Sequence, residues 1–221
     1  MSKNNIFIVI PSCNEEKQIA TVLRKALISR LPVVVVDDGS TDSTFEIAGK
    51  IVDNVIRHKT NLGKGAALKT GCEAAFALGA DAVVMMDSDG QHKIGDMDNF
   101  LEALYDGNEV VFGSRNLSHG VPLVRFMGNK MVSILISLLF NIYVSDILCG
   151  YRALTKRAYR KIAWESTGYG VETEMIINLA NTNLKYCEVP VETVYLDSVK
   201  GVTLLDAFAI LLDIIKWRIT K

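Results

Sequence analysis

Short apolar runs alternate with segments of helical periodicity through the first half of the chain, and this alternation limits the fold more than any other feature. Five apolar runs are typical of strands: residues 6–10, 33–36, 55–57, 82–86 and 109–112. Between the first two runs, apolar residues recur at helical spacing, and Lys64–Ala77 is rich in alanine. Strands this apolar are typical of parallel sheets covered on both sides. The sequence therefore predicts an α/β fold with a Rossmann-like, mostly parallel sheet and helices on both faces.

The second half of the chain is less regular. It predicts an apolar helix from about residue 126 to 143, a loop at 146–152, a helix around 174–181 and strands within 184–195. The apolar residues of 202–219 fall at helical spacing between charges, which predicts an amphipathic helix that can lie on a membrane. No linker rich in Pro, Gly or Ser interrupts the sequence, so residues 1–221 are expected to form a single domain.

Charge and cysteine content exclude several classes of protein. Lys and Arg number 24 against 25 Asp and Glu, so nothing in the net charge of −1 favours binding of nucleic acid. The four cysteines include no CxxC pair and build no zinc spacing with the three histidines, so we expect reduced thiols.

Two observations bear on location. The uncharged apolar stretch 131–145 would form a helix of about 22 Å, too short for a hydrocarbon core of about 30 Å. The apolar run near the N-terminus breaks at Pro11, which favours a first strand over a signal peptide. We therefore expect a cytoplasmic protein.

Polar side chains follow three of the predicted strands. Because ligands bind beyond the carboxyl ends of parallel strands, residues 11–16, 37–40 and 87–91 are expected to share one edge of the sheet. Asp87 and Asp89 lie one residue apart at such a strand end and can both turn toward a hard cation, Mg²⁺ or Mn²⁺. That cation would neutralise a diphosphate. A polar turn that caps the next helix is the alternative explanation.

A second polar segment runs from Asp37 to Thr44. One helix cap needs one side chain, and the surplus carboxylates suggest hydrogen bonds to a base or ribose, although a capped turn explains them equally well. No GxxxxGK[ST] occurs, and no GxGxxG follows the first strand. Lys64 lies between Gly63 and Gly65, where it either closes a loop around a nucleotide or sugar or starts the next helix.

Seven motifs together resemble one family. The motifs, in order, are IPSCNEE, VVDDGSTDST, NLGKGAALKTG, MDSDGQ, FGSR, DILCGYR and ETE. In order and spacing they are similar to family 2 glycosyltransferases of the GT-A fold, and most of all to the branch of dolichol-phosphate mannose synthases and polyprenyl-phosphate glycosyltransferases. The resemblance covers residues 6–200.

This resemblance implies a metal-dependent, inverting transfer of a hexose. The donor would be a nucleotide diphosphate sugar of the GDP-mannose or UDP-glucose type, and the acceptor a polyprenyl or dolichyl phosphate. One alternative is the same donor chemistry on a soluble or polysaccharide acceptor. The other is a noncatalytic module that binds nucleotide sugars.

The resemblance also implies which residues bind the donor. The nucleoside pocket would be lined by Pro11, Cys13, Glu15, Val36 and Asp38. The diphosphate and its metal would be surrounded by Asp87, Ser88, Asp89 and Gln91, with Asp87, Asp89 and Gln91 as metal ligands. This agrees with the chemistry, because the departing nucleoside diphosphate gains negative charge that a divalent cation stabilises.

Further residues are implied around the sugar. Arg115 would contact the donor or acceptor phosphate, and Asp146 would act as a base or orienting group. The alternative role for Asp146 is a salt bridge to Arg152. Glu172 and Glu174 resemble another motif near the active site, although favourable charge in a first helical turn also explains them.

The acceptor side has its own expected residues. A lipid phosphate is already anionic and needs no strong base to attack. Arg125 and Lys130 are expected to hold that phosphate while the helix 126–143 meets the polyprenyl chain at the membrane surface; a core helix with solvated basic residues is the alternative. A basic strip would touch anionic lipid or face solvent: Arg152, Lys156, Arg157, Arg160 and Lys161. We thus expect a peripheral protein on the cytoplasmic face of a membrane, with a separate membrane subunit as a further candidate partner.

Overall fold

A computed structural model describes residues 5–115, 123–192 and 212–219, and for residues 123–127 only the backbone. In these ranges one sheet contains the strands β1 (Ile6–Ser12), β2 (Val33–Asp37), β3 (Asn54–Arg57), β4 (Ala82–Met85), β5 (Val110–Arg115), β6 (Arg152–Thr155) and β7 (Tyr186–Val191). The helices are α1 (Ile19–Ala26), α2 (Thr44–Ala48), α3 (Lys64–Ala77), α4 (Met97–Tyr105), α5 (Leu123–Phe140), α6 (Lys156–Ile162), α7 (Val171–Ala180) and a last helix at 212–219. Two short 3₁₀ turns, η1 (Leu27–Ser29) and η2 (Ile94–Asp96), lie before β2 and α4.

The strands lie in the order β3-β2-β1-β4-β6-β5-β7. All neighbouring pairs are parallel except those of β6, which runs antiparallel to both β4 and β5. The predicted α/β fold with a mostly parallel sheet is confirmed. Strand β6 was not predicted, because its first residue, Arg152, was assigned to a loop.

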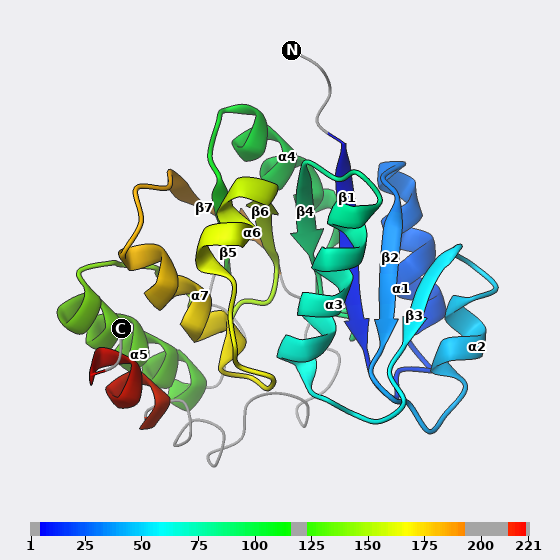
Figure 1. Ribbon diagram of the computed structural model, residues 1–221, viewed down its shortest axis with the longest axis horizontal. Helices are drawn as coiled ribbons and strands as arrows, with labels where there is room; N and C mark the ends of the chain where they lie inside the picture. The colour runs from blue at the N-terminus through cyan, green and yellow to red at the C-terminus, as the bar shows by residue number, and fades with distance from the viewer. Residues whose placement is uncertain (1–4, 116–122, 193–211, 220–221) are drawn as a thin grey trace.

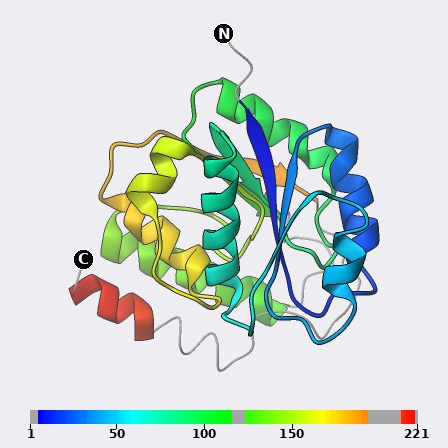
Figure 2. The same cartoon turned by 45° about the vertical axis from the view of Figure 1, so that its right-hand side comes forward.

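Two apolar cores lie on the two faces of the sheet. Alternate residues of β1 point to opposite sides, so Phe7 and Val9 join one core while Ile8 and Ile10 join the other. Helices α3, α5, α6 and α7 cover the first face, and α1, α2 and α4 cover the second (Figure 1 and Figure 2). The predicted placement of helices on both faces is therefore confirmed.

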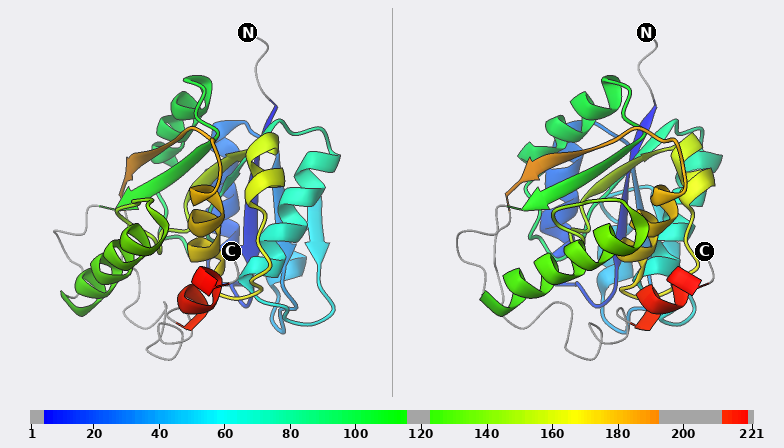
Figure 3. Two further views of the ribbon diagram at one scale, coloured as in Figure 1. Left: turned by 60° about the vertical axis from the view of Figure 1, so that its left-hand side comes forward. Right: turned by 90° about the vertical axis from the view of Figure 1, so that its left-hand side faces the viewer.

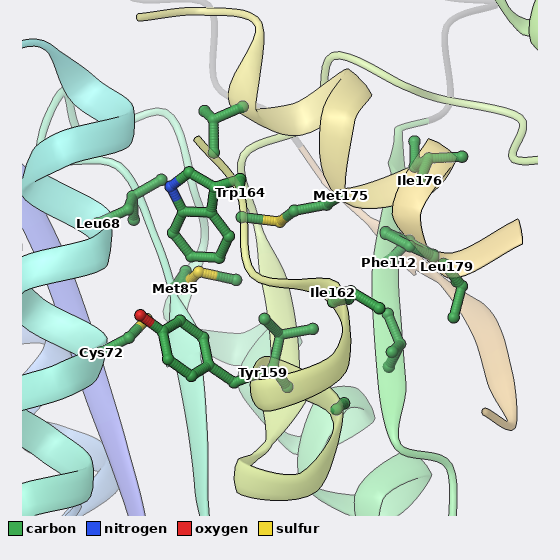
Figure 4. Close-up of a cluster of buried hydrophobic side chains, with 14 of the residues drawn as sticks. Leu68, Cys72, Met85, Phe112, Tyr159, Ile162, Trp164, Met175, Ile176 and Leu179 are labelled. Carbon is green, nitrogen blue, oxygen red and sulfur yellow. The ribbon is translucent and has the colours of Figure 1, made fainter. Parts of the chain in front are cut away.

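The core beneath α3 joins the two halves of the chain (Figure 4). Leu68 and Cys72 of α3 lie opposite Tyr159 of α6 and the following Trp164, which is 1% exposed. The indole Nε1 of Trp164 donates to the carbonyl of Gly65 at 2.8 Å. This contact fixes the start of α3 against the chain between α6 and α7.

A glycine lets α3 lie close to the sheet. A Cβ at Gly71 would come within 2.4 Å of Cγ1 of Val9 and 3.2 Å of Cγ2 of Val36, so only glycine permits this approach. The first residue of α3, Lys64, is thereby held at the carboxyl edge of β1 and β2.

Helix α5 and the last helix, 212–219, lie at the far end of the molecule from α2 (Figure 1). Helix α5 spans Leu123–Phe140, about three residues earlier than expected. Of the amphipathic helix expected at 202–219, residues 212–219 are helical and 202–211 lie outside the described residues. Among the described helices, none combines the length and the apolar character needed to cross a bilayer.

Candidate active site

Strands β1 and β2 deliver their polar segments to the same edge of the sheet (Figure 1). The backbone N–H of Asn14 donates to Oγ of Ser40 at 2.9 Å, and the Asn14 side chain accepts from the N–H of Thr41 at 2.9 Å. The N–H of Glu15 donates to Oγ1 of Thr44 at 2.8 Å. The two loops therefore form one polar surface beyond the strand ends, as the sequence predicts.

Asp38 binds the loop that leads into α3. Its Oδ1 lies 2.7 Å from Nδ1 of His58 and accepts from the N–H of Leu62 at 2.9 Å, while Oδ2 accepts from the N–H of Gly63 at 2.8 Å. The residue is 3% exposed. The structure thus assigns this carboxylate the positioning of residues 58–63, and a contact with a base or ribose stays a prediction.

The other residues expected around the nucleoside differ in exposure. Pro11 and Val36 are buried, and Val36 packs beneath α3. Cys13 and Glu15 are half-buried at the edge, where the amide of Asn61 donates to Sγ of Cys13 at 3.1 Å. Burial raises the pKa of the Cys13 thiol. A ligand at this edge would therefore reach the side chains of Cys13 and Glu15 before those of the other two.

Asp87 lies at the centre of a charged cluster that the sequence did not predict. Nζ of Lys64 is 2.7 Å from Oδ1 of Asp87 and 2.8 Å from Oε1 of Glu172. The other carboxylate oxygen of Asp87 lies 3.3 Å from Nε2 of His92. Lys64 thus starts α3 and also joins it to the end of β4 and the first turn of α7. Glu172, whose role was left open between helix charge and active site, belongs to this cluster.

The pKa values of Asp87 and Asp89 are shifted in opposite directions. Burial by itself raises the pKa of Asp87, but Lys64 and His92 outweigh it and hold that pKa well below its usual range. Burial and then the negative charge of Asp87 raise the pKa of Asp89, against a hydrogen bond from the N–H of Gln91 at 3.0 Å. The pKa of Lys64 is raised because its two carboxylate partners outweigh burial. Asp87 is thus held as an anion, whereas at Asp89 the same two cations lower the pKa by less than burial and the charge of Asp87 raise it.

The side-chain oxygens of residues 87–91 are of the kind that a hard cation binds. Asp87, Asp89 and Gln91 supply carboxylate and amide oxygens, which Mg²⁺ and Mn²⁺ prefer. Ser88 between them is 6% exposed. Within the described ranges, no group of three or more His, Cys, Asp and Glu residues is arranged around a single ion position. Because Nζ of Lys64 lies 2.7 Å from Oδ1 of Asp87, any cation at Asp87 would share that carboxylate with the ammonium of Lys64.

Arg115 and Asp146 form a second charged pair. Nε of Arg115 is 2.6 Å from Oδ2 of Asp146, and its Nη2 donates to Oδ1 at 2.8 Å. The amide of Asn129 on α5 also donates to Oδ1, at 3.1 Å. Asp146 is 1% exposed, whereas the Arg115 side chain retains 22% exposure. The two residues expected near the reacting phosphates are thus brought together, and sequence reasoning missed Asn129.

The predicted alternative for Asp146, a salt bridge to Arg152, is wrong. Arg152 begins β6 inside the core and is 1% exposed, so it belongs to no basic surface strip either. Its guanidinium donates to the carbonyls of Ile147, Cys149 and Glu172 at 2.5, 2.9 and 2.7 Å. Because β6 enters the sheet at this residue, the side chain is directed toward backbone carbonyls of the loop and of α7.

The loop from Asp146 to Arg152 connects the two charged clusters. Gly150 lies against Asp87, since a Cβ at Gly150 would come within 2.5 Å of Oδ2 of that carboxylate. The next residue, Tyr151, packs its ring 4.8 Å from that of His92. The DILCGYR segment therefore contacts both the Asp146 and the Asp87 ends of the site. Its spacing gave no sign of this, because Asp87 and Gly150 are far apart in the sequence.

The two residues expected to hold an acceptor phosphate, Arg125 and Lys130, both lie on α5. Nζ of Lys130 donates to the hydroxyl of Tyr143 at 3.1 Å. Arg125 lies in the first turns of α5, but its side chain is outside the described residues. A hollow of 360 Å³ opens beside Arg115 and is lined by Ser114, Arg115, Glu188, Val189 and Pro190.

Comparison with known proteins places this site in context. A sequence model described as "Glycosyl transferase family 2" matches residues 7–163. The "UDP-N-acetylglucosamine--dolichyl-phosphate N-acetylglucosaminyltransferase" of Methanococcus voltae is 29% identical and covers 100% of this chain and 99% of its own. The "Dolichyl-phosphate hexose transferase" of Haloferax volcanii is 32% identical over 93% of this chain and 89% of its own.

A solved structure supports the fold. Glucosyl-3-phosphoglycerate synthase from Mycobacterium tuberculosis, in complex with Mn²⁺, uridine diphosphate and phosphoglyceric acid, superimposes with a TM-score of 0.77. It is 20% identical and covers 97% of this chain and 78% of its own. At this identity, the likeness bears on the fold alone, and it agrees with the GT-A architecture expected from the sequence.

Proposed function

The chain belongs to glycosyl transferase family 2, and we propose that it transfers a hexose from a nucleotide diphosphate sugar to a polyprenyl or dolichyl phosphate. The match of dolichyl-phosphate glycosyltransferases over nearly the whole chain supports the acceptor class. The observation that carries the proposal is the Asp87 cluster, which the loop 146–152 joins to the Arg115–Asp146 pair. Cations and carboxylates so arranged suit a reaction between two phosphate-bearing substrates.

On the donor side, the residues that follow β4 would bind the diphosphate. Asp87, Asp89 and Gln91 would hold Mg²⁺ or Mn²⁺, which when bound supplies positive charge to the leaving diphosphate. The ammonium of Lys64, 2.7 Å from Asp87, adds a fixed positive charge at the same place. Glu172 keeps Lys64 directed toward Asp87 from the opposite side.

On the acceptor side, Arg115 would bind a phosphate and Asp146 would orient it. Three donors of Arg115, its backbone N–H included, and one of Asn129 occupy the carboxylate oxygens of Asp146, which favours the orienting role over that of a base. An anionic lipid phosphate needs no base of its own. Its oxygen forms the new bond to the anomeric carbon, the bond from that carbon to the diphosphate oxygen breaks, and the configuration inverts without a covalent enzyme intermediate.

This acceptor would place the reaction at a membrane surface. We propose that the protein acts as a peripheral protein on the cytoplasmic face, with or without a separate membrane subunit. The size of the 360 Å³ hollow beside Arg115 suits a phosphate and the first part of its chain better than a complete polyprenol.

Transfer to lipid tests the proposal. Purified protein is incubated with polyprenyl phosphate, Mg²⁺ or Mn²⁺ and a panel of radiolabelled UDP- and GDP-sugars, and label is extracted into organic solvent. One sugar should label the lipid, and Asp89→Ala should reduce transfer by about 100-fold or more. Asp98→Ala, an exposed acidic residue on α4, is the matched control and should retain transfer.

Two outcomes would contradict the proposal in different ways. Release of nucleotide without labelled lipid would assign the acceptor to a soluble or polysaccharide class. No turnover with any donor, together with binding of a nucleotide sugar, would favour the noncatalytic module. Full activity of Asp89→Ala with metal present would remove the metal assignment alone.

A further inference from the structure

Strand β7 is an edge strand of the sheet and lies beside β5, the strand that ends in Arg115 (Figure 3). In the parallel register of these two strands, Glu188 of β7 pairs with Phe112 of β5. Phe112 packs into the core on the side of α5 and α7, and residues paired across two strands share one face of the sheet. Glu188 therefore lies on the face that α5 covers.

One carboxylate oxygen of Glu188 holds Ser145, which lies in the loop after α5. Oε1 of Glu188 accepts from the backbone N–H and from the hydroxyl of Ser145, both at 2.7 Å. Oγ of Ser145 also lies 2.7 Å from Oγ of Ser114 on β5. Since the Ser145 hydroxyl donates its proton to Glu188, the Ser114 hydroxyl is the donor in this second contact. Ser145 is therefore fixed between β5 and β7.

The next residue on each of these two segments belongs to the Arg115–Asp146 pair. Ser114 binds Ser145, and Nε of Arg115 lies 2.6 Å from Oδ2 of Asp146. The backbone N–H of Arg115 donates to the same oxygen at 3.2 Å. Two consecutive residues of β5 thus bind two consecutive residues of the loop. The place of the Asp146 carboxylate consequently depends on where Ser145 is held.

Helix α5 holds the other side of Asp146 through Asn129. The side-chain amide of Asn129 donates to Oδ1 of Asp146 at 3.1 Å, and its oxygen accepts from the N–H of Ile147 at 3.2 Å. The loop is therefore held at residue 147 by α5 and at residue 145 by β7. Asp146 lies between these two fixed points, and Glu188 supplies the one on the sheet.

The second oxygen of Glu188 has a different environment. Among the described residues, Oε2 of Glu188 has no hydrogen-bond partner, and the side chain lines the 360 Å³ hollow beside Arg115. A carboxylate repels a phosphate, so binding of a phosphate in this hollow gives no reason for a second acidic residue beside Arg115. The two hydrogen bonds to Ser145 give such a reason.

We propose that Glu188 is a positioning residue of the transfer reaction. It holds Ser145 against Ser114, and thereby fixes Asp146 and the direction in which Asp146 holds the guanidinium of Arg115. This inference rests on the proposed function, in which Arg115 binds the acceptor phosphate. It adds to that function a side chain from the edge strand of the sheet, which acts on the acceptor through another residue.

Kinetics of two substitutions at Glu188 test the inference. Glu188→Ala removes both hydrogen bonds to Ser145 and should raise the KM for polyprenyl phosphate by about tenfold, with the KM for donor within about twofold of wild type. Glu188→Gln keeps an acceptor oxygen for Ser145, so its KM for polyprenyl phosphate should stay within about threefold of wild type. Glu102→Ala, at an exposed glutamate on α4, is the matched control and should keep both KM values.

Two kinetic results would overturn the inference. A Glu188→Gln protein as impaired as Glu188→Ala would mean that the negative charge, and not the contact with Ser145, is what the reaction needs. An equal rise of the KM for donor and for acceptor in Glu188→Ala would mean a general loss of structure at the site.

A double-mutant cycle tests whether Glu188 acts through Ser145. Ser145→Ala removes the hydroxyl and leaves the backbone N–H, so it should raise the KM for polyprenyl phosphate by about fivefold. The double variant should be within about twofold of Glu188→Ala alone, because both substitutions break the same series of contacts. Multiplication of the two effects would show that the two residues act independently, which would contradict the inference.

Hydrogen exchange provides a measurement that needs no turnover. The N–H of Ser145 is bonded to Glu188, so its exchange should become at least about tenfold faster in Glu188→Ala and stay close to wild type in Glu188→Gln. The N–H of Ile147, which is bonded to Asn129, is the internal reference and should change less. Unchanged exchange at Ser145 in Glu188→Ala would contradict the inference whatever the activity of the variant.

Failure of this inference and failure of the proposed function give different results. If wild type labels a lipid while Glu188→Ala keeps the wild-type KM for that lipid, the inference is wrong and the proposed function stands. If wild type labels no lipid, the proposed function is wrong, and the role of Glu188 in this transfer is wrong with it even where hydrogen exchange bears out the contact with Ser145.

Discussion

At the scale of single residues, Asp87 and Asp89 have opposite surroundings although one residue separates them. Lys64 and His92 compensate the charge of Asp87, whereas burial and the neighbouring Asp87 disfavour the charge of Asp89. A carboxylate whose charge is disfavoured in the folded protein costs stability at neutral pH, and such positions are typical of functional sites. This pair of environments supports the proposed cation site after β4.

Asp89→Asn should therefore stabilise the protein while reducing transfer by about 100-fold or more. Because the pKa of Asp89 is raised, protonated Asp89 adds to the stability of the folded protein below its ordinary pKa of about 3.9. This contribution is lost as the pH rises through the raised pKa. Asparagine keeps the neutral form at every pH. Thermal unfolding should show a higher midpoint than wild type at pH 7, and equal midpoints in acid. A lower midpoint at pH 7 would contradict the unfavourable charge assigned to Asp89.

Lys64→Met should have the opposite effect on stability. It leaves Asp87 and Glu172 facing each other without their shared cation, which should cost about 3 kcal/mol of unfolding free energy at pH 7. The depressed pKa of Asp87 contributes stability above about pH 3.9 that is lost as pH falls through that pKa. The deficit of the variant should therefore narrow in acid, as its two carboxylates bind protons.

Urea unfolding of Lys64→Met across pH measures this deficit. Lys69→Met provides the control, because Lys69 is an exposed lysine on the same helix and its replacement should leave stability within about 0.5 kcal/mol of wild type. A deficit that stays constant with pH would mean that packing of the Lys64 chain, and not its charge, is what the protein loses.

At the scale of secondary structure, the sequence predicts the five strands of the first half and helix α3, but misses α4 and the elements around residue 152. Helix α3 was expected at Lys64–Ala77 and lies there, since alanine content and helical spacing agree. Strand β6 was missed because it starts with a buried arginine, which was assigned to a loop. The charge of Arg152 suggested a surface, and the carbonyls of the preceding loop and of Glu172 explain its burial.

The loop between Asp146 and β6 yields a prediction of its own. Gly150→Ala would place a Cβ within 2.5 Å of the Asp87 carboxylate, so this carboxylate must move. We expect transfer to fall by about tenfold or more through a higher KM for donor, with the cooperative unfolding transition retained. Steady-state kinetics and far-UV circular dichroism measure the two effects.

Gly128→Ala in α5 is the matched control for Gly150→Ala. No described atom lies within 4 Å of a Cβ at Gly128, and alanine in a helix is about 1 kcal/mol more favourable than glycine. This variant should therefore keep wild-type kinetics with equal or greater stability. An unchanged donor KM in Gly150→Ala would show that Asp87 and the loop move independently.

At the scale of the whole molecule, the sheet order explains why the site was predicted only in part. Strands β1 to β4 are parallel, and the rule that ligands bind beyond their carboxyl ends located Asp87 and Asp89. Strand β6 lies between β4 and β5, so the loop before it lies against the end of β4. That order is set by pairing between distant segments, and periodicity within a segment carries no information about it.

Because residues from both halves of the chain share one core, we expect the two halves to unfold together. Helix α3 from the first half and α6 and α7 from the second share one core, and Trp164 donates to the carbonyl of Gly65. Trp164→Phe removes that hydrogen bond and part of the buried ring, which should cost about 2 kcal/mol. It also leaves Trp217 as the sole tryptophan of the chain.

Guanidinium unfolding of Trp164→Phe can therefore follow the second half by the fluorescence of Trp217 and the whole chain by circular dichroism. Since both halves share one core, the two transitions should have the same midpoint, lower than that of wild type. A fluorescence midpoint well below the circular dichroism midpoint would mean that the C-terminal helix or the second half unfolds by itself. In that case the Asp87 cluster, which takes residues from both halves, would come apart before the first half loses its fold.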